Sequence, residues 1–209
     1  MKLFKNIRAY IETIASIEPS RERKDLLAPL IEYVLSKQVQ QLPIRLHFIC
    51  THNSRRSHLS QVWGQTFAYF FGLDNVVCTS AGTEATALYP LVAEILQEVG
   101  FELKTVKKGN NPLYLLDYSV EAAPLQLFSK DLGHESNPLD DFAAIMSCNH
   151  ADENCPILPG AEQRISLTYE DPKNFDNHPL QLEKYNTTML QIASELYFVF
   201  LQISNKIKA

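Results

Sequence analysis

The sequence contains no apolar run long enough to cross a membrane, and it contains only four cysteines among 209 residues. The longest apolar run near its end, residues 196–201, is far shorter than the roughly 20 residues of a membrane-spanning helix. Residues 1–17 alternate apolar and charged side chains, so they lack the continuous apolar segment of a secretory signal. We therefore expect a cytoplasmic protein whose cysteines stay mostly reduced. Such cysteines serve catalysis or metal binding more often than structural disulfides.

Positive charge is also scarce, because 19 lysine and arginine residues face 24 acidic ones and give a formal net charge of −5. Nothing in this balance indicates nucleic acid or an anionic membrane as a partner. A site for an anionic ligand would therefore have to be positive locally. The hydrophobic content of 45% and the charged content of 21% are ordinary for a globular protein, and the length suits one domain with appendages.

Helices and strands alternate in the predicted order of elements along residues 43–209, which we expect to form the main domain. Apolar runs predict buried strands, and apolar residues at helical spacing predict the helices between them. The predicted strands cover residues 44–49, 75–80, 142–147 and 164–167, and the predicted helices cover residues 57–71, 90–99 and 179–206. This order is typical of an α/β fold, a three-layer sandwich in which helices cover both faces of a central, four-stranded parallel sheet.

Two segments stand apart from this alternation. Residues 1–42 carry two stretches of helical periodicity separated by Pro19 and Ser20, and Ser20 is a suitable N-cap for the second stretch. We expect an N-terminal helical hairpin there, and a homodimer contact is one role that would suit it. Residues 109–133 contain two short apolar runs around a proline-containing turn, which predict a β-hairpin inserted into the main domain.

The motif that carries most chemical information follows the first predicted strand. It is the loop Cys50-Thr51-His52-Asn53-Ser54-Arg55-Arg56-Ser57. A strand–loop–helix turn directs several backbone N–H groups at one point, and the helix N-terminus behind them favours an anion. A thiol at such a point titrates at about 3.5 to 7.5 rather than at ~8.5, so Cys50 is a candidate thiolate nucleophile.

Three other side chains of this loop suit the same chemistry. Arg56 lies six residues after Cys50, so its fork can swing back over the loop and take two oxygens of a tetrahedral oxyanion. Ser57 can donate a hydrogen bond to the sulfur, and Asn53 tolerates the left-handed backbone of a tight loop. The alternative interpretation is a buried cysteine at a strand end, followed by two solvated arginines.

The segment F-I-C-T-H-N-S-R-R-S-H-L-S-Q resembles the nucleophile loop of the low-molecular-weight protein tyrosine phosphatase superfamily, and it is most similar to that of the thioredoxin-coupled arsenate reductases. The resemblance covers roughly residues 44–206. It implies the fold of that superfamily, with Cys50 as nucleophile, Arg56 as oxyanion clamp and Ser57 as support for the sulfur. It also implies that the residues between them bind the oxyanion, namely Thr51, His52, Asn53, Ser54 and Arg55.

The chain departs from the family pattern at three positions. His52 replaces a usual glycine, which bears on the backbone angles of the loop and on substrate access. Arg55 stands where the reductases often have a cysteine. Gln61 replaces a glutamate that helps to form a potassium site in some reductases, although Asn53 and Ser80 match the other ligands. We therefore predict no metal site.

The resemblance also implies a proton donor. Family members carry an Asp-Pro pair after a late strand, with the aspartate as general acid, and this chain has Asp171 and Pro172 in that place. A carboxyl group near a bound anion has a raised pKa, which suits proton donation at neutral pH. Considered alone, an Asp-Pro pair is more often an ordinary turn. Lys173 stands where the phosphatases commonly have a tyrosine.

Cys148 and Cys155 distinguish the two branches of the superfamily. They lie in the segment M-S-C-N-H-A-D-E-N-C-P, which resembles the redox segment of the thioredoxin-coupled reductases. The resemblance implies that Cys148 attacks Cys50 in an arsenate adduct, that Cys155 takes over the disulfide, and that a mobile polar segment presents it to thioredoxin. The alternatives are two buried structural cysteines, or a zinc site with His150, although zinc favours four ligands and closer spacing. Cys78, in the middle of a predicted strand, is expected to be core packing.

The sequence leaves three functional hypotheses open. The first is an arsenate reductase that uses a relay of Cys50, Cys148 and Cys155 and is recycled by thioredoxin, without a tightly bound cofactor. The second is a phosphatase that hydrolyses phosphotyrosine or small phosphoesters through Cys50, Arg56 and Asp171. The third is an anion-sensing module without catalysis, which the joint presence of these residues argues against.

Overall fold

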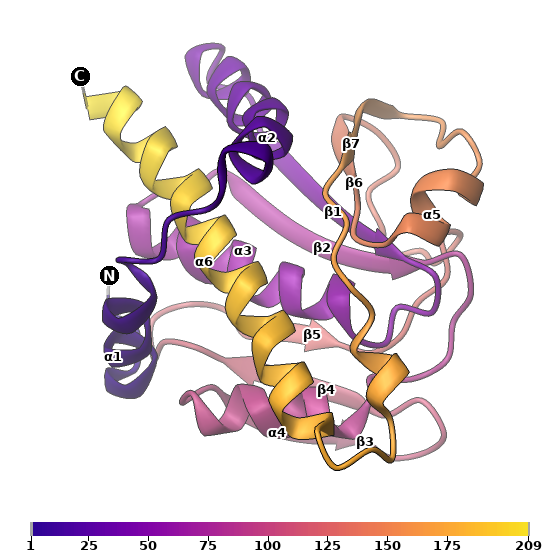
Figure 1. Ribbon diagram of the computed structural model, residues 1–209. Coiled ribbons are helices and arrows are strands. Elements are labelled where there is room, and N and C mark those ends of the chain that lie inside the picture. Colours follow the sequence, from indigo (N-terminus) through magenta and orange to yellow (C-terminus); the bar gives the residue numbers. More distant parts are fainter. Residues whose placement is uncertain (1, 209) are drawn as a thin grey trace.

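The centre of the protein is a parallel β-sheet of four strands, seen in a computed structural model that describes residues 2–208 (Figure 1). The strand order is β2-β1-β6-β7, and all neighbouring strands are parallel. The strands are β1 (Ile44–Cys50), β2 (Val76–Gly82), β6 (Phe142–Met146) and β7 (Ala161–Ser166). The two central strands, β1 and β6, are almost entirely buried, which explains their continuous apolar sequences. The predicted central parallel sheet is confirmed.

Helices cover the two faces of this sheet unequally. They are α2 (Arg21–Val39), α3 (Arg56–Phe71), α5 (Asn149–Asn154) and α6 (Gln181–Lys208). On one face, α3 lies against β1 and β2, α2 lies against β1 and β7, and α6 packs on both helices. The large core fills this side and includes Trp63 and Phe67. On the other face, α5 contacts β1 and β6 above a smaller apolar cluster.

A second, antiparallel sheet lies beside the first. Its order is β3-β4-β5, and its strands are β3 (Glu102–Lys107), β4 (Leu113–Asp117) and β5 (Leu125–Leu127), which follow helix α4 (Pro90–Glu98). The predicted hairpin is confirmed as β4 and β5, whose buried Leu116 and Leu127 join the large core. Strand β3 was not predicted, because its side chains are mostly exposed and give no apolar alternation.

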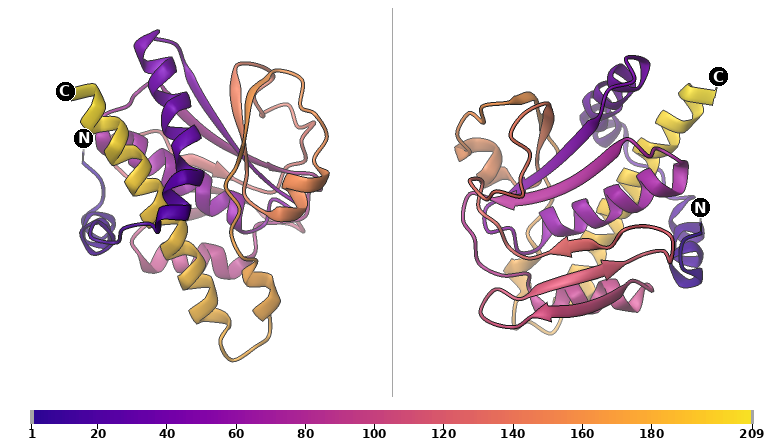
Figure 2. Two further views of the ribbon diagram at one scale, coloured as in Figure 1. Left: turned by 45° about the horizontal axis from the view of Figure 1, so that its top comes forward. Right: turned by 180° about the vertical axis from the view of Figure 1, so that it is seen from behind.

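Both predicted N-terminal helices form, but they do not pack together as a hairpin. Helix α1 (Lys5–Ile14) and helix α2 each lie on α6, and Figure 2 shows them at separate places beside it. Ser20 caps α2 as predicted, because its hydroxyl accepts from the Arg23 N–H at 3.2 Å. The buried apolar residues of both helices belong to the large core, so these side chains are not available to a second copy of the chain, whereas Leu26 and Val39 of α2 are exposed. Within residues 2–208, no helix is both long enough and apolar enough to cross a membrane.

A buried ion pair joins α2 to α6. Arg23 donates to both carboxylate oxygens of Glu195, from Nε at 2.8 Å and from Nη2 at 2.6 Å. The Glu195 side chain is only 4% exposed. Arg23 also donates to the carbonyl of Thr168 at 3.1 Å, so the pair ties the N-terminal helix to the segment that leads to Asp171.

Arg23→Ala should destabilise the protein by about 3 to 5 kcal/mol, because it leaves the Glu195 carboxylate buried without its partner. The measurement is the free energy of unfolding from urea denaturation. Lys24→Ala is the matched control, since Lys24 pairs with Glu18 at the surface, where the two side chains are 39% and 71% exposed. Such exposed pairs contribute about 0 to 1 kcal/mol. Equal losses in the two variants would contradict a stabilising link between α2 and α6.

Candidate active site

The loop between β1 and α3 surrounds the sulfur of Cys50. Strand β1 ends at Cys50 and helix α3 begins at Arg56, so the predicted strand–loop–helix arrangement is confirmed. The Ser57 hydroxyl lies 3.0 Å from the sulfur, and Asn53 Nδ2 donates to the same hydroxyl oxygen at 2.8 Å. Because this oxygen accepts from Asn53, the Ser57 proton is free to point at the sulfur. A hydrogen bond of that kind stabilises a thiolate.

The backbone of the loop is held from two sides. Asn53 has a φ of 43°, which is the left-handed backbone that an asparagine was predicted to tolerate here. Its Oδ1 accepts from the backbone N–H of Lys130 at 2.8 Å. The loop carbonyls of Cys50 and Thr51 accept N–H groups of the segment after β2, at 3.1 and 2.8 Å. Gly82 permits this approach, because a Cβ there would lie only 2.7 Å from the Thr51 carbonyl. The loop is therefore fixed before any ligand binds.

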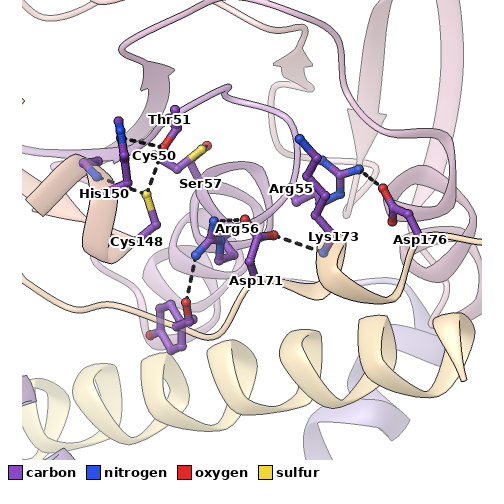
Figure 3. A network of polar contacts seen from close by, with 12 residues as sticks. Cys50, Thr51, Arg55, Arg56, Ser57, Cys148, His150, Asp171, Lys173 and Asp176 are labelled. Carbon is purple, nitrogen blue, oxygen red and sulfur yellow. Dashed lines mark hydrogen bonds and ion pairs between the residues drawn. The ribbon is translucent and has the colours of Figure 1, made fainter. Parts of the chain in front are cut away.

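Arg56 lines the space beside Cys50 and reaches from there to the segment after β7. Its Nη1 donates to the Tyr169 carbonyl at 2.8 Å, and its Nη2 pairs with the Asp171 carboxylate (Figure 3). The other Asp171 oxygen accepts from the Lys173 N–H at 3.1 Å and caps the short 3-10 helix η1 (Pro172–Phe175). The structure thus brings together the predicted oxyanion clamp and the predicted acid, 115 positions apart in the chain.

The space above Cys50 is small. It measures about 10 Å³ and is lined by residues that include Cys50, Ser54, Arg56 and Asp171. Both terminal nitrogens of Arg56 are already engaged beside it, one by the Tyr169 carbonyl and one by the Asp171 carboxylate. An oxyanion that takes the Arg56 fork therefore has to displace Asp171 from it.

A wider cleft of about 610 Å³ opens beside this space, and Cys148 is one of the residues that line it. The Cys148 sulfur lies 3.5 Å from the Thr51 hydroxyl, and Thr51 directly follows Cys50 in the chain. The Nδ1 atom of His150 lies 3.4 Å from the same hydroxyl. Figure 3 shows these side chains grouped on one side of the loop. A second thiol is thus present at the edge of the candidate oxyanion site.

The segment between Cys148 and Cys155, which we expect to be polar and mobile, forms a short helix, α5. The Cys148 sulfur accepts from the Ala151 N–H at 3.4 Å and so caps the helix. Arg164 of β7 donates to the carbonyls of Cys155 and Ala151 at 3.0 and 3.1 Å. The helix thus depends on a contact with a distant strand. Cys155 is buried, and burial raises the pKa of its thiol.

Two loop residues hold other parts of the protein, although both also line the space beside Cys50. The Arg55 side chain turns away and pairs with Asp176 at 2.6 Å. His52 holds its neighbours through its carbonyl, which accepts from the hydroxyls of Ser129 and Thr86 at 2.8 and 3.1 Å. The φ of His52 is not positive, so a side chain at this position causes no backbone strain.

Several other polar and thiol side chains near the loop have structural rather than catalytic surroundings. His47 is buried and hydrogen-bonds Thr79 at 2.7 Å, and burial lowers its pKa to about 3, so it stays neutral. Burial also raises the pKa of Cys78, which lies in the large core as expected. The Ser80 hydroxyl donates to Gln61 Oε1 at 2.6 Å. Among residues 2–208, no three His, Cys, Asp or Glu side chains gather as a metal site would require.

Sequence reasoning missed three contributors to this region. Lys130 was not considered, although its N–H braces Asn53 and burial lowers the pKa of its ammonium group to about 8. His150 was considered only as a zinc ligand, although its position two residues after Cys148 indicated nearness to that thiol. The role of Asp176 could not be recognised from the sequence, because its partner Arg55 is 121 positions away.

In this chain the first strand of a parallel sheet ends at a cysteine, and the loop that follows leads into a helix. This is the arrangement expected of the low-molecular-weight phosphatases. The solved structure of a low molecular weight phosphotyrosine phosphatase from Vibrio cholerae O395 matches this chain with a TM-score of 0.52 at 15% sequence identity. The match covers 79% of this chain and 99% of that chain. The fold is therefore that of the low-molecular-weight phosphatases.

Sequence relatives place the chain more closely. Residues 45–117 match the family described as low molecular weight phosphotyrosine protein phosphatase. Arsenate reductase 1 of Staphylococcus saprophyticus subsp. saprophyticus is 31% identical over 128 residues, which cover 61% of this chain and 77% of that protein. Arsenate reductase 2 of Staphylococcus epidermidis is 29% identical over 127 residues, with the same coverage. The chain belongs to the low molecular weight phosphotyrosine protein phosphatase family.

Proposed function

We propose that the protein is an arsenate reductase that uses Cys50, Cys148 and Cys155 as a thiol relay. The observation that supports this most directly is the position of Cys148, whose sulfur lies 3.5 Å from the hydroxyl of the residue after Cys50. Hydrolysis of a phosphoester needs no second thiol, because water completes that cycle. The names of the two staphylococcal relatives support the same substrate.

In the first step, the Cys50 thiolate attacks the arsenic atom of bound arsenate. A sulfur–arsenic bond forms, one arsenic–oxygen bond breaks, and the leaving hydroxyl takes a proton from Asp171 and departs as water. Arg56 is the group suited to hold two of the remaining oxygens, and the backbone N–H groups of the loop suit the developing charge. Arsenic remains pentavalent at this stage.

In the second step, the Cys148 thiolate attacks the Cys50 sulfur. A disulfide forms, the sulfur–arsenic bond breaks, and its electron pair goes to arsenic, which leaves as arsenite. The Ala151 N–H, 3.4 Å from the Cys148 sulfur, supports the thiolate. The Thr51 hydroxyl lies 3.5 Å from this sulfur and 3.4 Å from His150 Nδ1, so it offers a path for the thiol proton.

In the third step, Cys155 attacks the Cys148 sulfur and releases Cys50 as a thiolate. The rise of a helix, ~1.5 Å per residue, sets the Cα atoms of Cys148 and Cys155 roughly 10 Å apart across α5. A disulfide needs about 4.4 to 6.8 Å, so α5 has to unwind before the bond can form. The unwound segment then carries the disulfide to a dithiol reductant, for which thioredoxin is the proposed partner.

Phosphoester hydrolysis is the second candidate function. The pairing of Arg56 with Asp171 beside Cys50 supports it, because a nucleophile, an oxyanion clamp and an acid are together. These three residues suffice to form a cysteinyl-phosphate, which water then hydrolyses. Lys173, which lines the wider cleft, provides no aromatic wall for phosphotyrosine.

The two candidate functions predict different results from one pair of assays. We expect arsenate-dependent oxidation of thioredoxin by the wild-type protein, with slower hydrolysis of an aryl phosphate under the same conditions. Hydrolysis without arsenate turnover, when reduced thioredoxin is supplied, would reject the reductase in favour of the phosphatase. Loss of both activities in a folded protein would leave only an anion-binding role.

A further inference from the structure

Two adjacent arginines of the loop of residues 50–57 form ion pairs with the two ends of one short segment. Arg56 pairs with Asp171, and Arg55 pairs with Asp176 at 2.6 Å. Between these two aspartates lies only the 3-10 helix η1. Figure 3 shows both arginines reaching from the same loop to this segment. The segment that carries the proposed acid is therefore attached to the loop of residues 50–57 at two points.

The attachment through Arg55 is the more enclosed of the two. Its guanidinium carbon lies 4.1 Å from the centre of the Tyr89 ring, and its Nε donates to the Tyr185 hydroxyl at 2.5 Å. The Tyr185 hydroxyl in turn donates to the second carboxylate oxygen of Asp176 at 2.5 Å. The Arg55 and Asp176 side chains are only 10% and 20% exposed. Because the two tyrosines are fixed by α6 and by the start of α4, this pair can persist through turnover.

The attachment through Arg56 cannot persist in the same way. An oxyanion that binds beside Cys50 takes the Arg56 fork, and Asp171 then has to give up the Nη2 atom with which it pairs. Asp171 then loses its ion pair at the moment when it has to donate a proton. What still holds the segment near the loop is the contact between Arg55 and Asp176.

We propose that Arg55 is a positioning residue which, through Asp176, keeps Asp171 at the leaving oxygen while Arg56 binds the oxyanion. The proposal rests on the proposed function only in taking Asp171 as the general acid, and it does not depend on the reduction of arsenate. It also explains why the Arg55 side chain pairs with Asp176, although an arginine in this loop was expected to bind the substrate anion. The substrate charge is met by Arg56, and the charge of Arg55 is met by Asp176.

Aryl phosphates with different leaving groups test this role. Phenyl phosphate needs a proton on its leaving oxygen, whereas p-nitrophenyl phosphate needs it much less. For Arg55→Gln and Asp176→Asn we expect kcat/KM for phenyl phosphate to fall about tenfold or more, part of the roughly 10² to 10⁴ that general acid catalysis contributes. The value for p-nitrophenyl phosphate should fall much less. The double variant should be no worse than either single variant, because both remove the same contact.

The same assays distinguish positioning by Arg55 from two alternatives. In the first, Arg55 only attracts the anion, and in the second, its replacement damages the fold. Asp176→Asn keeps the charge of Arg55, so if Arg55 acts only by attracting the anion, this variant will hydrolyse phenyl phosphate normally and the proposal fails. Equal losses for both substrates would indicate general damage to the fold and would also overturn it. Arg45→Gln is the matched control, since Arg45 lies at the opposite end of β1 and pairs with Asp141 at 3.7 Å on the surface. This variant should behave as wild type with both substrates.

Hydrogen–deuterium exchange gives a readout that needs no turnover. Amides of residues 173–177 should stay protected in the wild type with and without saturating inorganic phosphate. In Asp176→Asn they should be protected without phosphate and exchange faster with it, because phosphate takes Arg56 away. Unchanged protection in this variant would overturn the proposal. A missing arsenate activity would reject the reductase function alone and would leave these results as they stand.

Discussion

Cys148→Ser should abolish arsenate turnover while aryl phosphate hydrolysis largely survives. In the proposed relay, the Cys148 thiolate is the group that breaks the sulfur–arsenic bond and delivers two electrons to arsenic. A serine hydroxyl is not ionised near neutral pH and cannot form a disulfide, so the loss should be on the order of a thousandfold or more, as for other lost nucleophiles. Hydrolysis depends on Cys50, Arg56 and Asp171, which this change leaves in place.

The measurement compares both activities in the wild type and in Cys148→Ser, with thioredoxin supplied in excess. Cys155→Ser extends the test, because it blocks only the last transfer and should accumulate a disulfide between Cys50 and Cys148. Peptide mapping without reductant detects that bond. Wild-type arsenate turnover in Cys148→Ser would exclude this thiol from the reaction, and a fall in both activities together would assign it a structural role.

The parts of this protein that were predictable from the sequence are those in which local pattern and burial agree. Strands β1 and β6 are apolar throughout because both of their faces are covered. The loop after β1 was predictable because a cysteine, a turn-tolerant Asn53 and a helix start follow one another within eight residues. The nearness of Asp171 to Arg56 followed from the family resemblance, and the structure shows the two side chains paired.

The parts that were not predictable depend on contacts between distant residues. Helix α5 has six residues, too few for a stable helix by itself, and Arg164 of β7 holds its carbonyls. Strand β3 is mostly exposed, so it has no hydrophobic alternation to reveal it. The direction of Arg55 depends on Asp176, far along the chain. A positive side chain in an anion-binding loop is naturally assigned to the anion, and only the position of its carboxylate partner changes that assignment.

The N-terminal helices are a second case in which the sequence predicted the elements but not their tertiary contacts. Their apolar periodicity predicted two helices correctly, but it could not say which surface they cover. Both are amphipathic segments outside the family resemblance, which suggested an appendage and a dimer contact. The structure buries one apolar face of each against the core around α6, and Arg23 connects α2 with Glu195 and with the segment before Asp171. Helix α2 is therefore linked to the segment that leads to the proposed acid.

Cys50→Ser should have the largest effect on catalysis, since arsenate reduction and aryl phosphate hydrolysis both begin with attack by this sulfur. Both activities are expected to fall by more than about a thousandfold, because the hydroxyl is a weak nucleophile without a general base beside it. Ser57, 3.0 Å away, is a neutral hydroxyl and too weak a base to activate the serine. Cys78→Ala is the matched control, a buried cysteine in the large core whose loss should leave both activities near wild type.

Anion binding by Cys50→Ser distinguishes a lost nucleophile from a damaged loop. The loop keeps its N–H groups and Arg56 in this variant, and it loses the sulfur that is a negatively charged thiolate in the proposed mechanism and would repel an oxyanion a few ångströms away. Inorganic phosphate should therefore bind several-fold more tightly than to the wild type, as titration calorimetry would measure. Weaker binding would mean that the serine has disturbed the loop, and retained turnover would mean that another residue attacks the substrate. Tighter binding with no turnover is the result expected for a thiolate nucleophile at Cys50.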